Sequence, residues 1–193
     1  MLTVLSNWRG YLELTKPGVQ ALLFVSCVSG MLIGADFNPP ITVLVFGLIG
    51  ISFLAASSAV INHFFDQKID AKMNRTSSRP LVIGDISSQH AIIFSILLYV
   101  SGSLMLLNFT NFLTWLLTTL TFIFYGFIYT RYLKFMTSQN IVIGGAAGAF
   151  PPVIGWAISA NTISIEPLIL FLIIFFWTPS HFWALSLYKN EDY

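Results

Sequence analysis

Charged residues are scarce in this chain, at 9% of 193 residues, whereas soluble domains average about 25%. Hydrophobic residues make up 56% of the sequence, and its mean hydropathy is +0.80. This shortage of charge excludes a soluble globular domain and predicts an integral membrane protein surrounded by the lipid bilayer. The net charge of +1 identifies no class of partner, and we expect no nucleic acid to bind.

Cysteine is almost absent as well. Cys27 is the single cysteine, so an intrachain disulfide is excluded. Because Cys27 lies inside an apolar run, we expect a small buried hydrophobic side chain rather than a reactive thiol. The stretch Met1–Lys16 has no signal-peptide cleavage site and mixes polar with apolar residues. It is therefore not predicted to be a signal peptide.

Long apolar runs, in contrast, dominate the chain. Six segments are apolar and long enough to cross a bilayer core, which requires about 20 residues. The composition therefore predicts an all-α integral membrane protein built as a bundle of about six transmembrane helices. The predicted spans are Gly18–Ala35, Ile41–Phe65, Ala91–Asn108, Phe112–Tyr129, Asn140–Ala160 and Pro167–Tyr188.

The basic residues follow the connections between these spans. All nine Lys and Arg residues fall at the termini or in the longer connections Asp66–His90 and Thr130–Gln139, and the short connections contain none. Cytoplasmic loops of membrane proteins carry an excess of Lys and Arg. We therefore expect both termini and both longer loops on the cytoplasmic or matrix side.

Small residues and prolines interrupt two of the spans. Gly144–Ala149 forms a small-residue face suited to close helix contact, and Pro151 and Pro152 follow it and predict a kink or break. Pro179 lies similarly within the last span. Kinked helices that pack through small residues favour a bundle around a central cavity over a set of simple lipid anchors.

The chemistry is concentrated where the second span ends. Asn62, Asp66 and Asp70 are spaced four residues apart, so on a helix they form one oxygen-bearing stripe. Mg²⁺ is commonly bound by one or two carboxylates together with substrate phosphates. The alternative is a solvated helix end whose acids pair with Lys68 or Lys72. We favour Asp66 and Asp70 as metal ligands, because an amide one turn deeper needs a partner.

A cationic cluster follows the stripe. Lys72, Arg75 and Arg79 suit a phosphate or diphosphate, although any cytoplasmic loop could carry them as topology determinants. Arg79 precedes Pro80, which favours a fixed turn. In the next longer loop, Arg131 and Lys134 are predicted to share the same anionic substrate, while the aromatic residues beside them are equally compatible with interfacial anchors.

The three histidines are assessed separately. His63 and His90 flank the first longer loop, and ordinary hydrogen-bonded polar residues are the favoured interpretation. His181 lies within the last span among large aromatic residues. An ionisable residue inside a membrane span is by default a functional-site hypothesis, so His181 is a candidate contact for a porphyrin or its iron.

Taken together, these motifs resemble a known family. Asn62, Asp66 and Asp70, followed by Arg75-Thr76 and Arg79-Pro80-Leu81, resemble the first aspartate-rich motif of intramembrane aromatic prenyltransferases. The protoheme IX farnesyltransferase (heme O synthase) branch is indicated by further segments over nearly the whole chain: Leu14–Pro17, Tyr129-Thr130, Leu133-Lys134, Asn140–Gly145, Gly155-Trp156 and His181–Leu185.

The resemblance implies transfer of a farnesyl group from farnesyl diphosphate to a vinyl group of protoheme IX, giving heme O for a terminal oxidase. It implies Mg²⁺ on Asp66 and Asp70, with Asn62, Arg75 and Arg79 in the catalytic set. Lys72, Arg131, Lys134 and His181 are then substrate contacts. It also implies a bacterial or mitochondrial inner membrane, with heme or terminal-oxidase assembly proteins as downstream partners.

Three differences from the family pattern are visible. Ser180 and Phe135 stand where a proline and a basic residue are usual. The family also has about nine spans and a second acidic motif, whereas this sequence stops where that motif opens, at Glu191–Tyr193. We therefore expect residues 1–193 to be one transmembrane prenyltransferase domain corresponding to the N-terminal two thirds of the fold, and not to be active alone.

Two alternatives stay open at this point. One is another prenyltransferase of the same superfamily, acting on hydroxybenzoate, naphthoate or a chlorin, because the aspartates alone do not identify the acceptor. The other is an inactive, truncated, heme-binding membrane remnant. A phosphatidyltransferase is excluded, because the Asp-Gly and Ala-Arg spacing typical of that family is absent.

Overall fold

The computed structural model describes residues 7–137 and 139–188, and within these ranges the regular elements are all helical. This agrees with the predicted all-α class. The helices are α2 Trp8–Leu14, α3 Pro17–Gly34, α4 Ile41–Asp70, α5 Pro80–Ile83, α6 Ser88–Phe109, α7 Phe112–Ile123, the π-helix η1 Phe124–Leu133, α8 Lys134–Met136, α9 Asn140–Ala149, α10 Pro151–Ala160 and α11 Ile165–Tyr188.

The described residues contain six helical stretches long and apolar enough to cross a membrane. Helices α3, α4, α6 and α11 each supply one stretch, α7 with η1 and α8 supplies another, and α9 with α10 supplies the sixth. The six predicted spans are therefore confirmed, with boundaries displaced by a few residues. The fold is that of a multi-pass membrane protein.

One predicted boundary was wrong. The sequence placed a polar loop from Thr130, but the helix continues through the π-helical turns of η1 and on to Met136. Within η1, the Thr130 hydroxyl donates to the Tyr125 carbonyl at 2.8 Å. The polar residues from Thr130 onward therefore do not end the helix. The Thr130 hydroxyl is hydrogen-bonded within the helix, and the charged Arg131 and Lys134 lie near its end.

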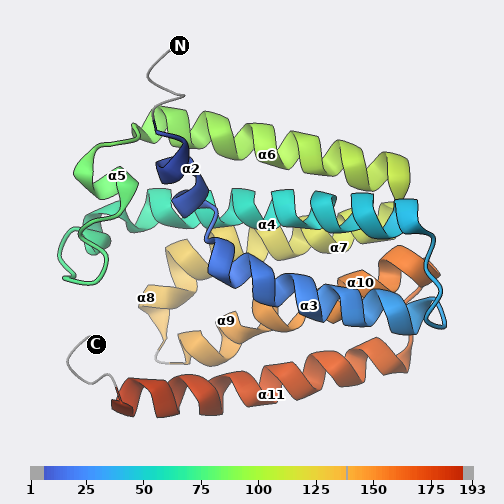
Figure 1. The fold of residues 1–193 in the computed structure, drawn as a ribbon. Helices are drawn as coiled ribbons and strands as arrows, with labels where there is room; N and C mark the ends of the chain where they lie inside the picture. The colour runs from blue at the N-terminus through green and yellow to red at the C-terminus, as the bar shows by residue number, and fades with distance from the viewer. Residues whose placement is uncertain (1–6, 138, 189–193) are drawn as a thin grey trace.

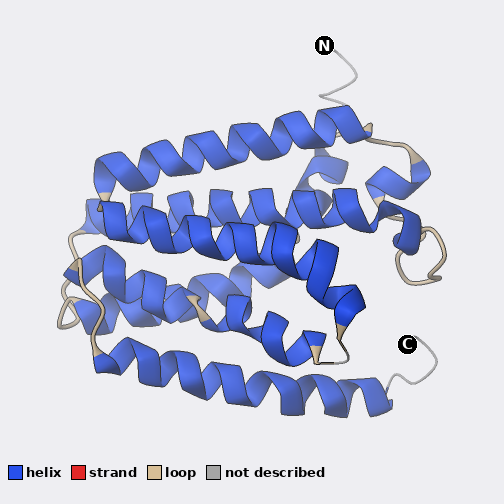
Figure 2. Cartoon of the chain, turned by 180° about the vertical axis from the view of Figure 1, so that it is seen from behind, coloured by secondary structure: helices blue, strands red, loops and turns tan. Residues whose placement is uncertain are grey.

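All the spans run roughly along one axis, and the two longer connections lie at the same end of the bundle (Figures 1 and 2). The loop that contains α5 and the turn after α8 both lie at the end where α4 finishes, on the left of Figure 1. The short connections lie at the opposite end. This places the predicted acidic stripe and the second basic loop on the same side.

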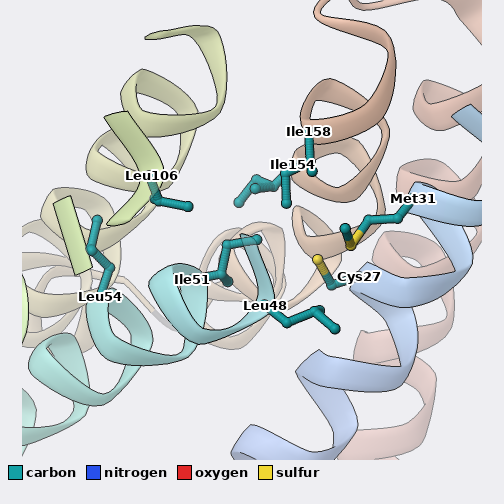
Figure 3. Packing of buried hydrophobic residues seen from close by; sticks show 8 residues of the cluster. All are labelled: Cys27, Met31, Leu48, Ile51, Leu54, Leu106, Ile154 and Ile158. Carbon is teal, nitrogen blue, oxygen red and sulfur yellow. The ribbon is translucent and has the colours of Figure 1, made fainter. Parts of the chain in front are cut away.

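The core lies where α3, α4, α6 and α10 meet (Figure 3). Cys27 is buried there, as expected. The helices α3 and α10 cross closely through glycines: a Cβ on Gly30 would lie 2.0 Å from the Pro152 carbonyl oxygen, and one on Gly155 would lie 2.0 Å from that of Cys27. The eight residues in Figure 3 are Cys27, Met31, Leu48, Ile51, Leu54, Leu106, Ile154 and Ile158.

A break separates α9 from α10 at Phe150, directly before the paired prolines. The predicted interruption is therefore confirmed, and its cause is the loss of backbone donors at Pro151 and Pro152. Helix α11, in contrast, continues through Pro179.

A second buried cluster fixes the long loop against the end of α4. Leu81 and Ile86 from the loop pack with Leu14, Val60 and Ala91. Pro80 occupies the first turn of α5, where its missing N–H costs no hydrogen bond. These contacts determine where Arg79 lies.

Candidate functional site

The predicted stripe exists as a buried row on the last turns of α4. Asn62, Asp66 and Asp70 have exposures of 5%, 4% and 4%. The Asn62 amide nitrogen donates to Asp66 Oδ2 at 2.9 Å and to Thr130 Oγ1 at 3.1 Å. The amide thus has the partners that its depth in the bundle requires.

Each carboxylate of the stripe forms an ion pair with a cation from another segment. Lys134 Nζ lies 3.0 Å from Asp66 Oδ2, and Arg79 donates to Asp70 Oδ2 at 2.5 Å. The alternative in which these acids pair with Lys68 or Lys72 at a solvated helix end does not hold within the described residues. The acids are buried, and their partners come from beyond α4.

Lys16 also belongs to this cluster, although it was not among the site residues predicted from the sequence. Its Nζ donates to Asn62 Oδ1 at 2.5 Å and to the Tyr125 hydroxyl at 3.3 Å. Burial, followed by the positive charge of Arg79, lowers the pKa of Lys16 from 10.5 to about 8. The available sequence signal was a lysine directly before Pro17, at the start of the first apolar run.

The π-helix η1 forms the wall facing this part of α4. Thr130 is buried and accepts from Asn62, and Tyr125 stacks on Tyr129 with ring centroids 5.8 Å apart. Regular π-helices are rare and often occur at functional sites. No periodicity in the sequence signalled one here.

The carboxylates fit a Mg²⁺ ion that takes its remaining ligands from water and a phosphorylated molecule. Asp66 Oδ1 is buried and has no hydrogen-bond partner, so it is available to a cation. Among the described residues, no group of three or more His, Cys, Asp or Glu side chains forms a metal cage. Two carboxylates without a full protein cage are typical of Mg²⁺ sites that also use substrate phosphates.

The other predicted site residues lie outside the ion-paired cluster. Lys72 and Arg75 are exposed in the loop after α4. Arg131 is exposed, and its guanidinium lies 5.4 Å from the centroid of the Phe65 ring. Within residues 7–137 and 139–188, the ion pairs to the stripe are made by Arg79 and Lys134.

The histidines differ from expectation in one case. His63 was expected to be a hydrogen-bonded residue, but it is buried and neither ring nitrogen has a partner. The side chains of Lys16 and Thr130 bond instead to Asn62, the residue before it in the sequence. His181 is exposed on α11 and stacks on Trp177 at 4.4 Å between centroids.

A cavity of about 140 Å³ adjoins the cluster, bounded by α3, α4, α7, η1, α9 and α10. Lys16 and Tyr125 line it, and its remaining walls are mostly apolar. The predicted central cavity is therefore confirmed. Together, the charged cluster and the apolar cavity suit a molecule with an anionic head and an apolar tail.

Comparison with models of known protein families identifies the family of this chain. The model of the UbiA prenyltransferase family matches residues 23–193. This chain belongs to the UbiA prenyltransferase family. The resemblance inferred from the aspartate motif is confirmed.

Within this family, the chain is similar to curated protoheme IX farnesyltransferases. The chain is 49% identical to protoheme IX farnesyltransferase 1 of Pseudomonas fluorescens strain Pf-5, over 96% of this chain and 62% of that protein. It is also 49% identical to protoheme IX farnesyltransferase 2 of Pseudoalteromonas atlantica, over 97% of this chain and 61% of the relative. The chain therefore spans about 62% of the length of such relatives.

Two solved structures share the fold. A structure of digeranylgeranylglyceryl phosphate synthase matches with a TM-score of 0.77 and 25% identity, over 88% of this chain and 59% of that one. A UbiA homologue from Archaeoglobus fulgidus, bound to GPP and Mg²⁺, matches with a TM-score of 0.76 and 24% identity. The match covers 93% of this chain and 64% of the homologue. The predicted second acidic motif at 191–193 lies outside the described residues.

Proposed function

We propose that this chain forms the diphosphate-binding part of a protoheme IX farnesyltransferase, and that residues 1–193 act as one transmembrane prenyltransferase domain. The observation that carries the proposal is a buried pair of carboxylates, each bonded to a cation, beside an apolar cavity. The farnesyltransferase relatives support the choice of substrates. The reaction transfers farnesyl from farnesyl diphosphate to a vinyl group of protoheme IX.

Mg²⁺ fits this site through Asp66 and Asp70, and when bound it supplies positive charge to the diphosphate oxygens. Asp66 offers its unpartnered Oδ1, and Asn62 holds the other oxygen of the same carboxylate. The Archaeoglobus homologue bound to GPP and Mg²⁺ supports this assignment.

The cations of the cluster stabilise the leaving group. Arg79 and Lys134 lie directly at the carboxylates and donate to the phosphate oxygens on which negative charge develops. Arg75, Lys72 and Arg131 lie further out as exposed cations. They attract the diphosphate as it approaches.

The bond changes balance without an oxidant or reductant. The C1–O bond of farnesyl diphosphate breaks, and its electron pair leaves with the diphosphate. The terminal vinyl carbon attacks the allylic cation, which moves the positive charge to the carbon next to the porphyrin ring. Water adds there and loses a proton, giving the hydroxyethyl group of heme O. Apolar cavity walls limit earlier capture of the cation by water.

The acceptor side and the orientation are also proposals. His181 lies on α11 beside Trp177, and this pair offers an imidazole and aromatic surface to the porphyrin.

The helix end that carries the cluster faces the cytoplasm or matrix, because both basic loops lie there (Figure 1). The proposed host membrane is a bacterial or mitochondrial inner membrane, where heme O passes to heme or terminal-oxidase assembly proteins.

The test is a competition between acceptors. Residues 1–193 are joined to the C-terminal third of a protoheme IX farnesyltransferase relative, because the chain spans about 62% of such a protein. Membranes containing this fusion receive farnesyl diphosphate with Mg²⁺ and either protoheme IX or 4-hydroxybenzoate, and mass spectrometry identifies the products. We expect heme O and no prenylated phenolic acid. Prenylation of the phenolic acid alone would contradict the assigned acceptor, and the absence of both products would contradict a prenyltransferase site built from residues 1–193.

A further inference from the structure

The backbone places Lys16 in an unusual conformation. Lys16 caps α3 with φ 53° and ψ 62°, in the left-handed region, immediately before Pro17. A residue other than glycine seldom adopts this region, and such strain persists where surrounding contacts enforce it. The side chain is correspondingly directed from α3 into the charged cluster of α4.

The contact with Asn62 determines which way the amide faces. An ammonium group donates hydrogen bonds and accepts none, so the amide oxygen must face Lys16 Nζ, at 2.5 Å. The amide nitrogen then faces the opposite side. It donates to Asp66 Oδ2 at 2.9 Å and to Thr130 Oγ1 at 3.1 Å.

This orientation has a consequence for Asp66. Its Oδ2 receives both the Asn62 amide and Lys134 Nζ, while its Oδ1 is left buried without a partner. A flipped amide would present its oxygen to Oδ2, and two oxygen acceptors would then repel each other. The free Oδ1 therefore depends on the amide orientation.

We propose that Lys16 is a positioning residue that orients the Asn62 amide and thereby holds Asp66 with one oxygen free for a divalent cation. This inference rests on the proposed function, since it concerns the same site. Lys16 acts through Asn62 and not by touching the cation. Partners that orient a metal ligand commonly change metal affinity by 10–100-fold when they are removed.

The first experiment observes the amide directly. The chain in lipid nanodiscs is labelled with ¹⁵N-asparagine, and the Asn62 side-chain signal is assigned as the one missing in Asn62→Ala. In Lys16→Met we expect this signal to shift and its protons to exchange faster with water, while Lys16→Arg, which also only donates, stays close to wild type. An unchanged Asn62 signal in Lys16→Met would overturn the proposal.

The second experiment measures Mn²⁺ affinity by electron paramagnetic resonance in a double-mutant cycle. We expect Lys16→Met and Asn62→Ala each to weaken binding by about 10-fold, and the double variant to be no weaker than Asn62→Ala. Because residues that act through one another are non-additive, losses that multiply to about 100-fold would contradict positioning through Asn62. Monodisperse elution confirms folding of each variant.

The two experiments separate this inference from the proposed function. If the wild-type chain bound no Mn²⁺, the proposed metal site would be contradicted and, with it, the role of the free oxygen. The Asn62 signal would still decide whether Lys16 orients the amide. If Mn²⁺ bound with unchanged affinity in Lys16→Met, the metal site would stand and the positioning role would fall.

Discussion

At the scale of single residues, the site depends on buried charges that neutralise one another. Asp66 and Asp70 are buried, and Lys134 and Arg79 are their partners. Removing one partner of such a pair leaves a buried charge uncompensated. Substitutions here should therefore affect ligand binding far more than substitutions of exposed charges nearby.

Lys134→Met tests this directly. The change removes the Asp66 partner and one proposed donor to the diphosphate, and a charged hydrogen bond contributes about 1.5–3 kcal/mol. We therefore expect farnesyl diphosphate to bind at least about 10-fold more weakly, as measured by calorimetry with the chain in nanodiscs. Lys68→Met, at an exposed position of the same charge on α4, is the matched control and should stay within about twofold of wild type. Equal losses in the two variants would contradict the assignment.

The lowered pKa of Lys16 predicts a dependence of stability on pH. The pKa of Lys16 is about 8 in the folded chain and 10.5 in the unfolded chain, so between these values the unfolded chain binds more protons. The free energy of unfolding should therefore rise with pH across this window. Unfolding in mixed detergent micelles should show a steeper rise for wild type than for Lys16→Met. Parallel curves would contradict the burial of a titrating Lys16.

The sequence predicted the stripe but not its partners, and the reason is distance along the chain. Spacing alone places Asn62, Asp66 and Asp70 on one helix face. Lys16, however, is 46 residues from Asn62, and only the packing of α3 against α4 brings them together. For the same reason, sequence spacing does not distinguish Arg79, which pairs with Asp70, from the exposed Arg75.

At the scale of elements, hydropathy located the spans, because each must satisfy its backbone internally in lipid. It did not locate η1, since a π-helix has no distinct hydrophobic pattern and both helix types satisfy the backbone. The paired prolines did predict the break at Phe150, because missing donors are a local property of the chain. Local chemistry was therefore predictable, and the variant helix geometry was not.

The close crossing of α3 and α10 gives a prediction at this scale. In Gly30→Ala, the new Cβ would meet the Pro152 carbonyl at 2.0 Å, so the helices must separate. Overpacking of this kind typically costs about 1–3 kcal/mol, and we expect a lower thermal unfolding temperature in detergent. Gly18→Ala on the same helix is the control, since nothing lies within 4 Å of its Cβ position. Equal stability of both variants would contradict the crossing.

At the scale of the whole molecule, the two basic loops share one end of the bundle (Figure 1). Orientation can be tested with single cysteines, because Cys27 is buried and protected. In intact spheroplasts, an impermeant maleimide should label Asn38→Cys on a short connection but label Ser78→Cys only after lysis. Labelling of Ser78→Cys in intact cells would reverse the proposed orientation.

The central claim is that the buried stripe binds a prenyl diphosphate with a divalent cation, and one binding measurement tests it most directly. Farnesyl diphosphate is titrated into the chain in nanodiscs, with Mg²⁺ or with EDTA, for wild type and Asp66→Asn. We predict binding to wild type that requires Mg²⁺, and a loss of at least about 10-fold in Asp66→Asn, because the free carboxylate oxygen becomes part of a neutral amide. Binding that is indifferent to both EDTA and the substitution would contradict the account.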